Sequence, residues 1–328
     1  MNAPVTHVLV HAPARLHLGF LDPDGHFGRR FGAIGCAVSG LDTVVSACRA
    51  SDSAIEGAVD ERAKALFESA MSVSGNVVPI RMTVQSRSPQ HAGLGSGTQL
   101  ALAIDTAVRR LAGQPCAPGC AAKRLGRGLR SGTGAALFEH GGLVVDGGVG
   151  DGSKVPPLVS RLALPDDWRV VLVRDEARQG LSGAAEKAAF RALQPLPEQT
   201  AGELCHRVLL GLLPAAAEGD FGAFSKHLGV LQEAVGSYFA DSQGGLFLSE
   251  AVSGAVEYCR DRFGLSGTGQ SSWGPTGFIF APDQRTGERV VEALSESQAA
   301  VGLILSVHAP DNTGARVSVT PAPRSATG

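Results

Sequence analysis

A glycine-rich stretch at residues 89–99 carries the residue types and spacing best suited to chemistry. Its closely spaced glycines let the backbone turn tightly and bring N–H groups close to a ligand, while a serine and a threonine add hydroxyl donors. An apolar run at 100–108 follows directly, and it predicts a helix whose positive end points to the same place. An ordinary glycine-rich turn is the alternative. As an anion-binding loop, the stretch would hold its ligand with Gly93, Leu94, Gly95, Ser96, Gly97, Thr98 and Gln99.

A second glycine-rich block occupies residues 126–152. Arginine suits bidentate contact with phosphate or carboxylate, so Arg130 is a candidate catalytic residue, with a solvated surface position as the alternative. Asp146 stands between an apolar strand and two glycines, where it would bind a metal ion such as magnesium, steady a cationic group, or simply cap a turn. The other expected substrate contacts of this block are Arg127, Ser131, Gly132, Thr133 and Gly134.

Two further candidates lie near the N-terminus. Arg15 and His17 are two residues apart in a strand-like segment, so their side chains point to one face and would receive an acid or a phosphate. The alternatives are a core salt bridge and a core histidine. Later in the chain, Glu186 would act as a base or ligand unless it lies on a solvated helix face. The remaining expected contacts, with helix capping or core packing as their alternatives, are Ser182, Gly183, Gly267, Gly269, Gln270 and Trp273.

The elements that position these residues divide the chain into two parts. Strand-like runs at 7–10, 33–38, 43–47 and 77–84 precede the loop and its helix. After a strand at 169–173, helical spacing recurs at 184–193, 204–213, 219–235, 250–263 and 288–294, with strands at 278–280 and 303–307. The pattern predicts an α+β protein with an N-terminal domain at 1–165, a C-terminal α+β domain at 166–319 and a flexible tail at 320–328.

Composition narrows the class of partner. The 328 residues include 18% charged and 5% aromatic residues, with a net charge of −2, so nothing favours nucleic acid binding. No segment reaches the roughly 18 uninterrupted apolar residues that a membrane span needs, and the N-terminus lacks the pattern of a secretion signal. We therefore expect a cytoplasmic protein that acts on small molecules.

Three motifs, at residues 11–17, 89–99 and 267–275, resemble in order and spacing those of the GHMP small-molecule kinase superfamily. Within it, the blocks at 93–99, 128–134 and 141–148 resemble the family of β-ribofuranosylaminobenzene 5′-phosphate synthases. The resemblance implies a two-lobe fold, with an N-terminal lobe like ribosomal protein S5 domain 2 and a ferredoxin-like C-terminal lobe. It also implies transfer of ribose 5-phosphate from phosphoribosyl pyrophosphate to 4-aminobenzoate or 4-hydroxybenzoate, with release of carbon dioxide and pyrophosphate, in methanopterin biosynthesis.

One departure from the kinase pattern supports this narrower match. Kinases of the fold place a second serine after the Gly-Leu-Gly-Ser core to help hold magnesium, and here that position is Gly97. The resemblance implies magnesium bound together with phosphoribosyl pyrophosphate, no ATP requirement, and a homodimer. An ATP-dependent small-molecule kinase is the main alternative, and a regulatory binding module without turnover is a second one.

Overall fold

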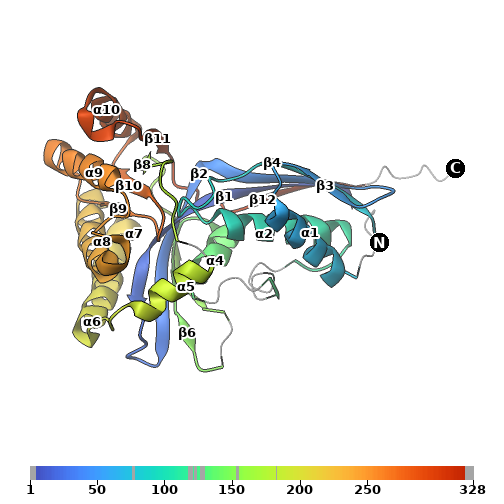
Figure 1. Cartoon of the computed structure of the whole chain (residues 1–328), viewed down its shortest axis with the longest axis horizontal. Helices are drawn as coiled ribbons and strands as arrows, with labels where there is room; N and C mark the ends of the chain where they lie inside the picture. The colour runs from blue at the N-terminus through green and yellow to red at the C-terminus, as the bar shows by residue number, and fades with distance from the viewer. Residues whose placement is uncertain are drawn as a thin grey trace.

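The computed structural model describes residues 5–75, 78–116, 121, 124–125, 130–152, 155–181 and 183–321. The chain forms two lobes, an elongated sheet with helices on one face and a compact group of helices around a second sheet (Figure 1). Helix α5 (Gly183–Ala192) lies where the lobes meet. This arrangement is the α+β two-lobe fold that the sequence predicts.

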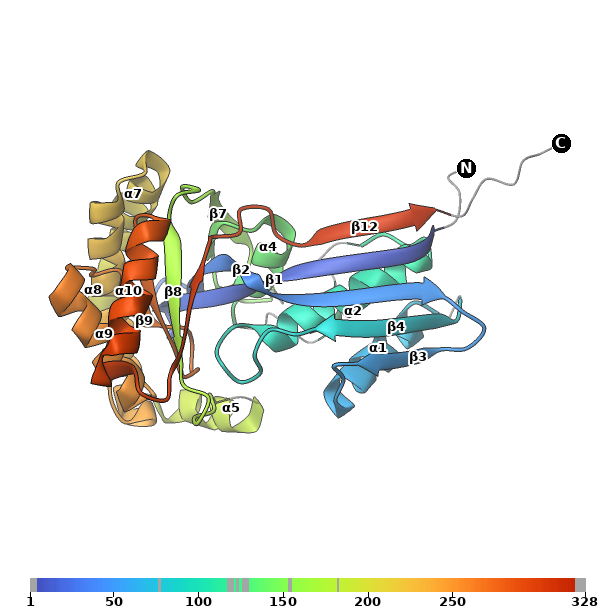
Figure 2. The same ribbon diagram turned by 90° about the horizontal axis from the view of Figure 1, so that it is seen from above.

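The N-terminal lobe is built on two long antiparallel strands, β1 (Val5–Asp22) and β2 (Arg29–Arg49). Figure 2 shows them in the order β12-β1-β2-β4-β3, with β12 (Arg316–Pro321), β4 (Ile80–Ser86) and β3 (Ala54–Gly57) alongside. At the other end of β2, β5 (Leu143–Asp146) and β6 (Val149–Gly150) pair with it, and β7 (Leu158–Leu162) pairs with β5. Alternate residues of β1 from Val8 to Leu18 are fully buried, as expected where one face of a strand meets a core.

Three helices cover this sheet, namely α1 (Glu61–Val73), α2 (Ser96–Leu111) and α4 (Thr133–His140). Two of them, α2 and α4, begin at the glycine-rich segments. Helix α2 packs against β1, β2, α1 and α4, and it is buried on nearly all sides. The glycine-rich loop therefore ends at a firmly held element.

The C-terminal lobe contains an antiparallel sheet in the order β11-β8-β10-β9. Its strands are β8 (Arg169–Arg174), β9 (Thr268–Gln270), β10 (Thr276–Ala281) and β11 (Ile304–His308). The described helices of this lobe, besides α5, are α6 (Glu198–Arg207), a π-helical turn (Val208–Leu212), α7 (Leu213–Glu218), α8 (Phe221–Gln243), α9 (Glu250–Phe263), α10 (Gln284–Glu296) and a 3₁₀ turn (Gln298–Ala300).

A single hydrophobic core joins the two lobes. It contains Leu16, Leu18 and Ile34 from the N-terminal sheet together with Phe224 and Phe278 from the C-terminal lobe, all of them fully buried. Protein interiors are close-packed, so the elements that meet at this core hold fixed positions. The strand that carries Arg15 and His17 passes through this junction.

The end of the chain differs from the sequence prediction. Residues 316–321 form β12, which pairs antiparallel with β1 in the N-terminal sheet, so the last part of the predicted second domain belongs structurally to the first lobe. Thr320 is part of that strand rather than of a tail, and residues 322–328 lie outside the described part of the chain. The alternation of apolar and polar residues in β12 is short. The pairing of β12 with β1 is a long-range contact, which the local sequence pattern does not reveal.

Candidate functional site

The glycine-rich loop borders a cavity of about 170 Å³ between the two lobes. Residues 93–98 form one wall, and Arg15, Arg62 and Arg87 bring three guanidinium groups to it. Glu186 and Ser272 reach it from the C-terminal lobe. The loop thus faces a polar, cationic space, as expected of an anion-binding site.

Strand β1 fixes Arg15 directly against the loop. The Arg15 backbone N–H donates to the carbonyl of Leu94 at 3.1 Å, and its Nη1 donates to the carbonyl of Gly93 at 3.3 Å. Gly95 has a φ of +73°, and a Cβ there would stand 2.5 Å from Cγ of Arg15. Position 95 therefore needs glycine both for its backbone conformation and for the close approach of the arginine.

Ser271 ties three sequence motifs together, and the sequence prediction did not include it. Its hydroxyl donates to the carbonyl of Gly93 at 2.7 Å and accepts from the backbone N–H of His17 at 3.0 Å. The backbone N–H of Ser272 donates to the carbonyl of His17 at 3.2 Å. The only signal for this role in the sequence is that Ser271 lies inside the motif at 267–275, in which only neighbouring residues were predicted as contacts.

His17 lies in a positively charged, dehydrated environment. Burial, together with the charges of Arg15 and Arg130, holds the pKa of His17 well below its usual value, so the imidazole is neutral at physiological pH. Its Nε2 is buried without a hydrogen-bond partner in the described structure. Burial also lowers the pKa of Arg15 to about 10, against the opposing effect of Glu186, and Arg15 remains charged. The prediction that Arg15 and His17 share one face is consistent with this electrostatic coupling.

Arg130 connects the cavity to a cluster of aromatic side chains. Its Nη2 pairs with Oε2 of Glu186 at 2.9 Å, and its guanidinium carbon lies 4.5 Å from the ring centroid of Phe190. Its Nη1 is buried and has no hydrogen-bond partner in the described structure. An unpaired buried donor is costly, so Nη1 is available to an incoming acceptor such as a carboxylate.

The aromatic cluster brings together five rings from both lobes. Phe190 lies between 5.5 and 6.3 Å from the rings of four others, measured between centroids: Phe20, Phe31, Phe239 and Trp273. His17 stacks at 4.5 Å on Phe20. Trp273 and Phe239 are buried, whereas Phe20, Phe31 and Phe190 are half-buried. Trp273 is covered by the rings of Phe190 and Phe239, which favours the core-packing alternative for this residue over direct contact with a ligand.

The second glycine-rich block meets the first one. Gln99 donates from Nε2 to the carbonyl of Gly134 at 3.0 Å, and a Cβ at Gly134 would stand 2.9 Å from Cγ2 of Thr98. The Ser131 and Thr133 hydroxyls lie 2.7 Å apart. The two blocks are therefore neighbours, although Gln99 and Gly134 serve their contact and not an open surface. Arg127 lies outside the described residues.

Asp146 is enclosed by donors of its own chain. One carboxylate oxygen accepts from the backbone N–H groups of Ala33 and Gly148 at 3.2 and 2.9 Å, and the other accepts from Gly132 N–H at 2.8 Å and the Ser131 hydroxyl at 3.3 Å. The side chain is buried, and burial raises its pKa against these hydrogen bonds. This geometry favours the turn-organising alternative over direct metal binding, because the oxygens already have partners.

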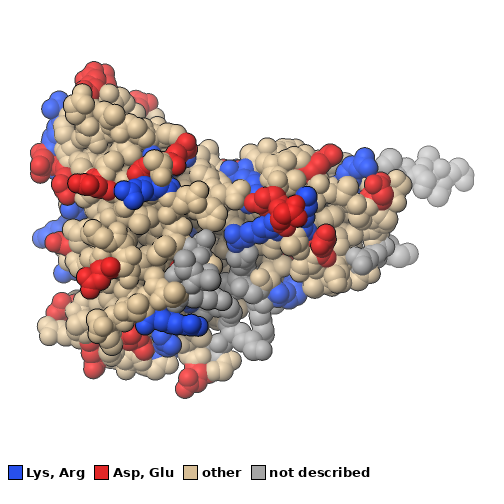
Figure 3. Space-filling model, in the orientation of Figure 1, with Lys and Arg blue, Asp and Glu red and all other residues tan. Residues whose placement is uncertain are grey.

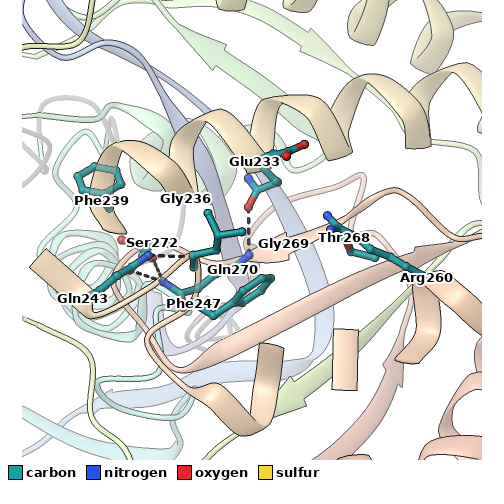
Figure 4. Close-up of a pocket in the computed structure, with 12 residues that line it drawn as sticks. Glu233, Gly236, Phe239, Gln243, Phe247, Arg260, Thr268, Gly269, Gln270 and Ser272 are labelled. Carbon is teal, nitrogen blue, oxygen red and sulfur yellow. Dashed lines mark hydrogen bonds between the residues drawn. The ribbon is translucent and has the colours of Figure 1, made fainter. Parts of the chain in front are cut away.

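Two other predicted contacts, Gly269 and Gln270, lie away from the loop, around a small cavity of about 50 Å³ in the C-terminal lobe (Figure 4). Gln270 accepts from Leu248 N–H at 2.7 Å and donates to Gln243 and Ser272, which leaves it no free group for a ligand. A Cβ at Gly267 or at Gly269 would run into α8. Glycine at these two positions is therefore needed for close packing against α8. Gly183 begins α5 with an open surface around it, and Ser182 lies outside the described residues.

The backbone is strained at the site. Phe31, His91 and Ser272 are the described non-glycine residues with a positive φ, at 75°, 56° and 56°. Phe31 belongs to the aromatic cluster, and the other two border the cavity. Such conformations cost of order 1–3 kcal/mol each and persist where the surroundings enforce them, as at binding sites.

Within the described residues, no group of three or more histidine, cysteine, aspartate or glutamate side chains is placed to hold a metal ion. No described helix is long and apolar enough to cross a membrane. On the face drawn in Figure 3, basic and acidic side chains alternate instead of forming one basic surface.

Comparison with known proteins gives a consistent result. Residues 57–142 match the GHMP kinases N terminal domain, and residues 212–300 match the GHMP kinases C terminal family. Two relatives carry the name beta-ribofuranosylphenol 5′-phosphate synthase. The one from Methanothermobacter thermautotrophicus is 30% identical over 83% of this chain and 88% of its own, and the one from Archaeoglobus fulgidus is 31% identical over 81% and 87%. Among solved structures, phosphomevalonate kinase from Streptococcus pneumoniae matches with a TM-score of 0.67 at 13% identity, over 93% of this chain and all of the other, which shows a shared fold.

Proposed function

Because the chain belongs to the beta-ribofuranosylphenol 5′-phosphate synthase family of the GHMP fold, we propose that it transfers ribose 5-phosphate from phosphoribosyl pyrophosphate to a 4-substituted benzoate. The product is a ribofuranosyl arene 5′-phosphate, with release of carbon dioxide and pyrophosphate. The acceptor is 4-hydroxybenzoate or 4-aminobenzoate, and the reaction belongs to methanopterin biosynthesis. The observation that carries the proposal is the junction of the cationic loop cavity with the aromatic cluster through Arg130 and Phe190.

The loop cavity suits the donor. Breaking the bond between the anomeric carbon and pyrophosphate develops negative charge on the leaving group, and fixed cations and N–H donors stabilise that charge. The N-terminus of α2 and the guanidinium of Arg15 supply both. In this proposal they bind the pyrophosphate.

The aromatic cluster suits the acceptor. A benzoate ring gains most from offset or edge-to-face packing, and the half-buried rings of Phe20, Phe31 and Phe190 would be its partners in this proposal. Nη1 of Arg130 would orient the carboxylate. Because Glu186 already balances much of the charge of Arg130, this contact does not hold the carboxylate in a full ion pair that would oppose the loss of carbon dioxide.

The reaction needs no base to restore the aromatic ring. The ring carbon that bears the carboxylate forms a bond to the anomeric carbon while the bond to pyrophosphate breaks. The bond from that ring carbon to the carboxylate then breaks, and its electron pair returns to the ring as carbon dioxide leaves. No proton departs from carbon. Neutral His17, stacked on Phe20, would then orient a substrate through Nε2 rather than carry a proton.

We propose that magnesium arrives with the donor pyrophosphate instead of being held by the protein. The side chains that could ligate a metal support this. Both oxygens of Asp146 already accept hydrogen bonds from N–H and hydroxyl groups, and position 97 has no hydroxyl. No step above depends on a protein-held metal or on ATP. A homodimer in the cytoplasm stays a prediction.

The test is product release by the purified protein with phosphoribosyl pyrophosphate, magnesium and either acid, without ATP. The proposal expects carbon dioxide and pyrophosphate in equal amounts, and the faster acid is the acceptor. Turnover of ATP with an alcohol, and no release from either acid, would overturn it in favour of a kinase. An Arg130→Ala variant controls for a contaminating enzyme, since it should lose the release.

A further inference from the structure

The guanidinium of Arg62 occupies the space that a side chain at position 97 would need. Arg62 is the second residue of α1, and Gly97 is the second residue of α2. A Cβ at Gly97 would stand 2.8 Å from Cζ of Arg62 and 3.0 Å from its Nη1. Both residues line the loop cavity.

The start of α1, from which Arg62 extends, is held by its neighbours. Asp60 caps that helix by accepting from Ala63 N–H at 2.8 Å, and its other oxygen pairs with Nη1 of Arg87 at 3.0 Å. The Arg87 side chain is only 7% exposed. This pair, with Arg87 buried and Asp60 partly exposed, anchors the end of α1 from which Arg62 extends toward the loop.

The charges around the cavity leave Arg62 without a counterion. Asp60 balances Arg87, and Glu186 acts on both Arg15 and Arg130. Arg62 has no ion-pair partner among the described residues. In addition, Nε of Arg15 and Nε of Arg87 are buried at the same cavity without hydrogen-bond partners in the described structure. A cation and two buried donors converge on one space, which is the arrangement an anion would satisfy.

We propose that Arg62 binds the pyrophosphate group of the donor, and that Gly97 is required because any side chain there displaces this arginine. The inference rests on the proposed function and adds to it a residue, Arg62, whose positive charge takes the place of a metal-binding hydroxyl at position 97. A guanidinium contacts phosphate oxygens through two parallel N–H groups, which suits a leaving group that must be held but not transferred.

The geometry predicts a specific coupling between the two positions. Gly97 lies in α2 and is not among the glycines with a positive φ, so serine fits its backbone. The group it would meet is the end of a flexible side chain, so Gly97→Ser should move Arg62 and leave the fold intact. Once Arg62 is removed, the same serine has nothing to displace. The effects of the two substitutions should therefore not add.

The experiment compares the wild type with Arg62→Ala, Arg62→Lys, Gly97→Ser and the double variant R62A/G97S. Calorimetry measures pyrophosphate binding with and without magnesium, and kinetics gives KM for both substrates. Losing a charge-assisted hydrogen bond corresponds to about a 10- to 100-fold weaker affinity. We expect that loss for pyrophosphate in R62A and in G97S, a smaller loss in R62K, and little change in KM for the aromatic acid. The double variant should bind no more weakly than R62A.

Arg81→Ala is the matched control, because Arg81 is an exposed arginine on β4 that pairs only with Asp52 among the described residues. Unchanged pyrophosphate affinity in R62A, or fully additive losses in the double variant, would overturn the inference. If the wild type binds pyrophosphate through Arg62 but releases no carbon dioxide, the proposed reaction fails and the binding role stands. If the wild type turns over and R62A matches it, only the role of Arg62 fails.

Discussion

The ion pair between Arg130 and Glu186 joins the two lobes at the boundary between the loop cavity and the aromatic cluster. Arg130 precedes α4 of the N-terminal lobe, whereas Glu186 lies in the first turn of α5. Both side chains are about a quarter exposed, at 28% and 24%. A pair so placed contributes little to stability but sets the direction of the free Nη1 of Arg130.

Glu186→Gln is expected to separate the effect of this ion pair on stability from its effect on how Arg130 binds the carboxylate. The variant should keep its free energy of unfolding within about 1 kcal/mol of wild type, because a partly exposed pair is weak. It should bind the aromatic acid more tightly and lose carbon dioxide more slowly, since an unbalanced Arg130 stabilises the carboxylate in the ground state. Kinetics with varied acid gives KM and kcat separately. A rise in KM with unchanged kcat would contradict the assigned role.

Asp146→Asn tests whether the carboxylate organises its turn or binds a metal. An amide cannot accept on both sides, so either the N–H of Gly132 or the N–H groups of both Ala33 and Gly148 lose their acceptor. We expect a loss of about 1–3 kcal/mol of unfolding free energy, together with reduced turnover. The magnesium concentration for half-maximal activity should not shift. A large shift in that concentration, without loss of stability, would restore the metal-binding alternative.

Ser271→Ala removes the hydroxyl that joins His17 to Gly93. The expected cost is about 1–3 kcal/mol, because the N–H of His17 is then buried without a partner. KM for phosphoribosyl pyrophosphate should rise as the loop loosens. Ser295→Ala is the control, since that hydroxyl bonds to Val291 on an exposed helix face. Denaturant titration measures the stability of each variant, and equal stabilities would refute the bridging role.

The sequence alone predicted the parts of the site that depend on local pattern. The glycine-rich loop, the helix after it and the shared face of Arg15 and His17 follow from spacing, and the structure has all three. The place of Arg62 at the loop cavity was missed, because it depends on α1 lying beside α2, which no motif encodes.

Tertiary contacts also explain the other differences. The predicted strands at 33–38 and 43–47 are one long strand, β2, because its partner β1 continues past the turn-like residues between them. Gln270 matched a motif, yet its amide is consumed by neighbours from α8 and the loop after it. A motif identifies residues near a site, and only the fold shows which of them keep a free polar group.

The last prediction concerns pH. Burial and the charges of Arg15 and Arg130 keep the pKa of His17 well below 6.5 in the folded protein, whereas the unfolded chain protonates it near 6.5. Between these two values the unfolded state binds a proton that the folded state does not, so stability falls as the pH drops below about 6.5. His17→Phe removes this protonation site, so the free energy of unfolding should fall less steeply with pH. The part of the fall that remains comes from His227 and His308, whose pKa values are also lowered by burial.

Denaturant titrations between pH 5 and 7.5 measure the slope of stability against pH, with exposed His206→Gln as the control. A slope in H17F equal to that of the wild type would mean that the imidazole takes up its proton in the folded protein, and the neutral, orienting role of His17 would fall with it.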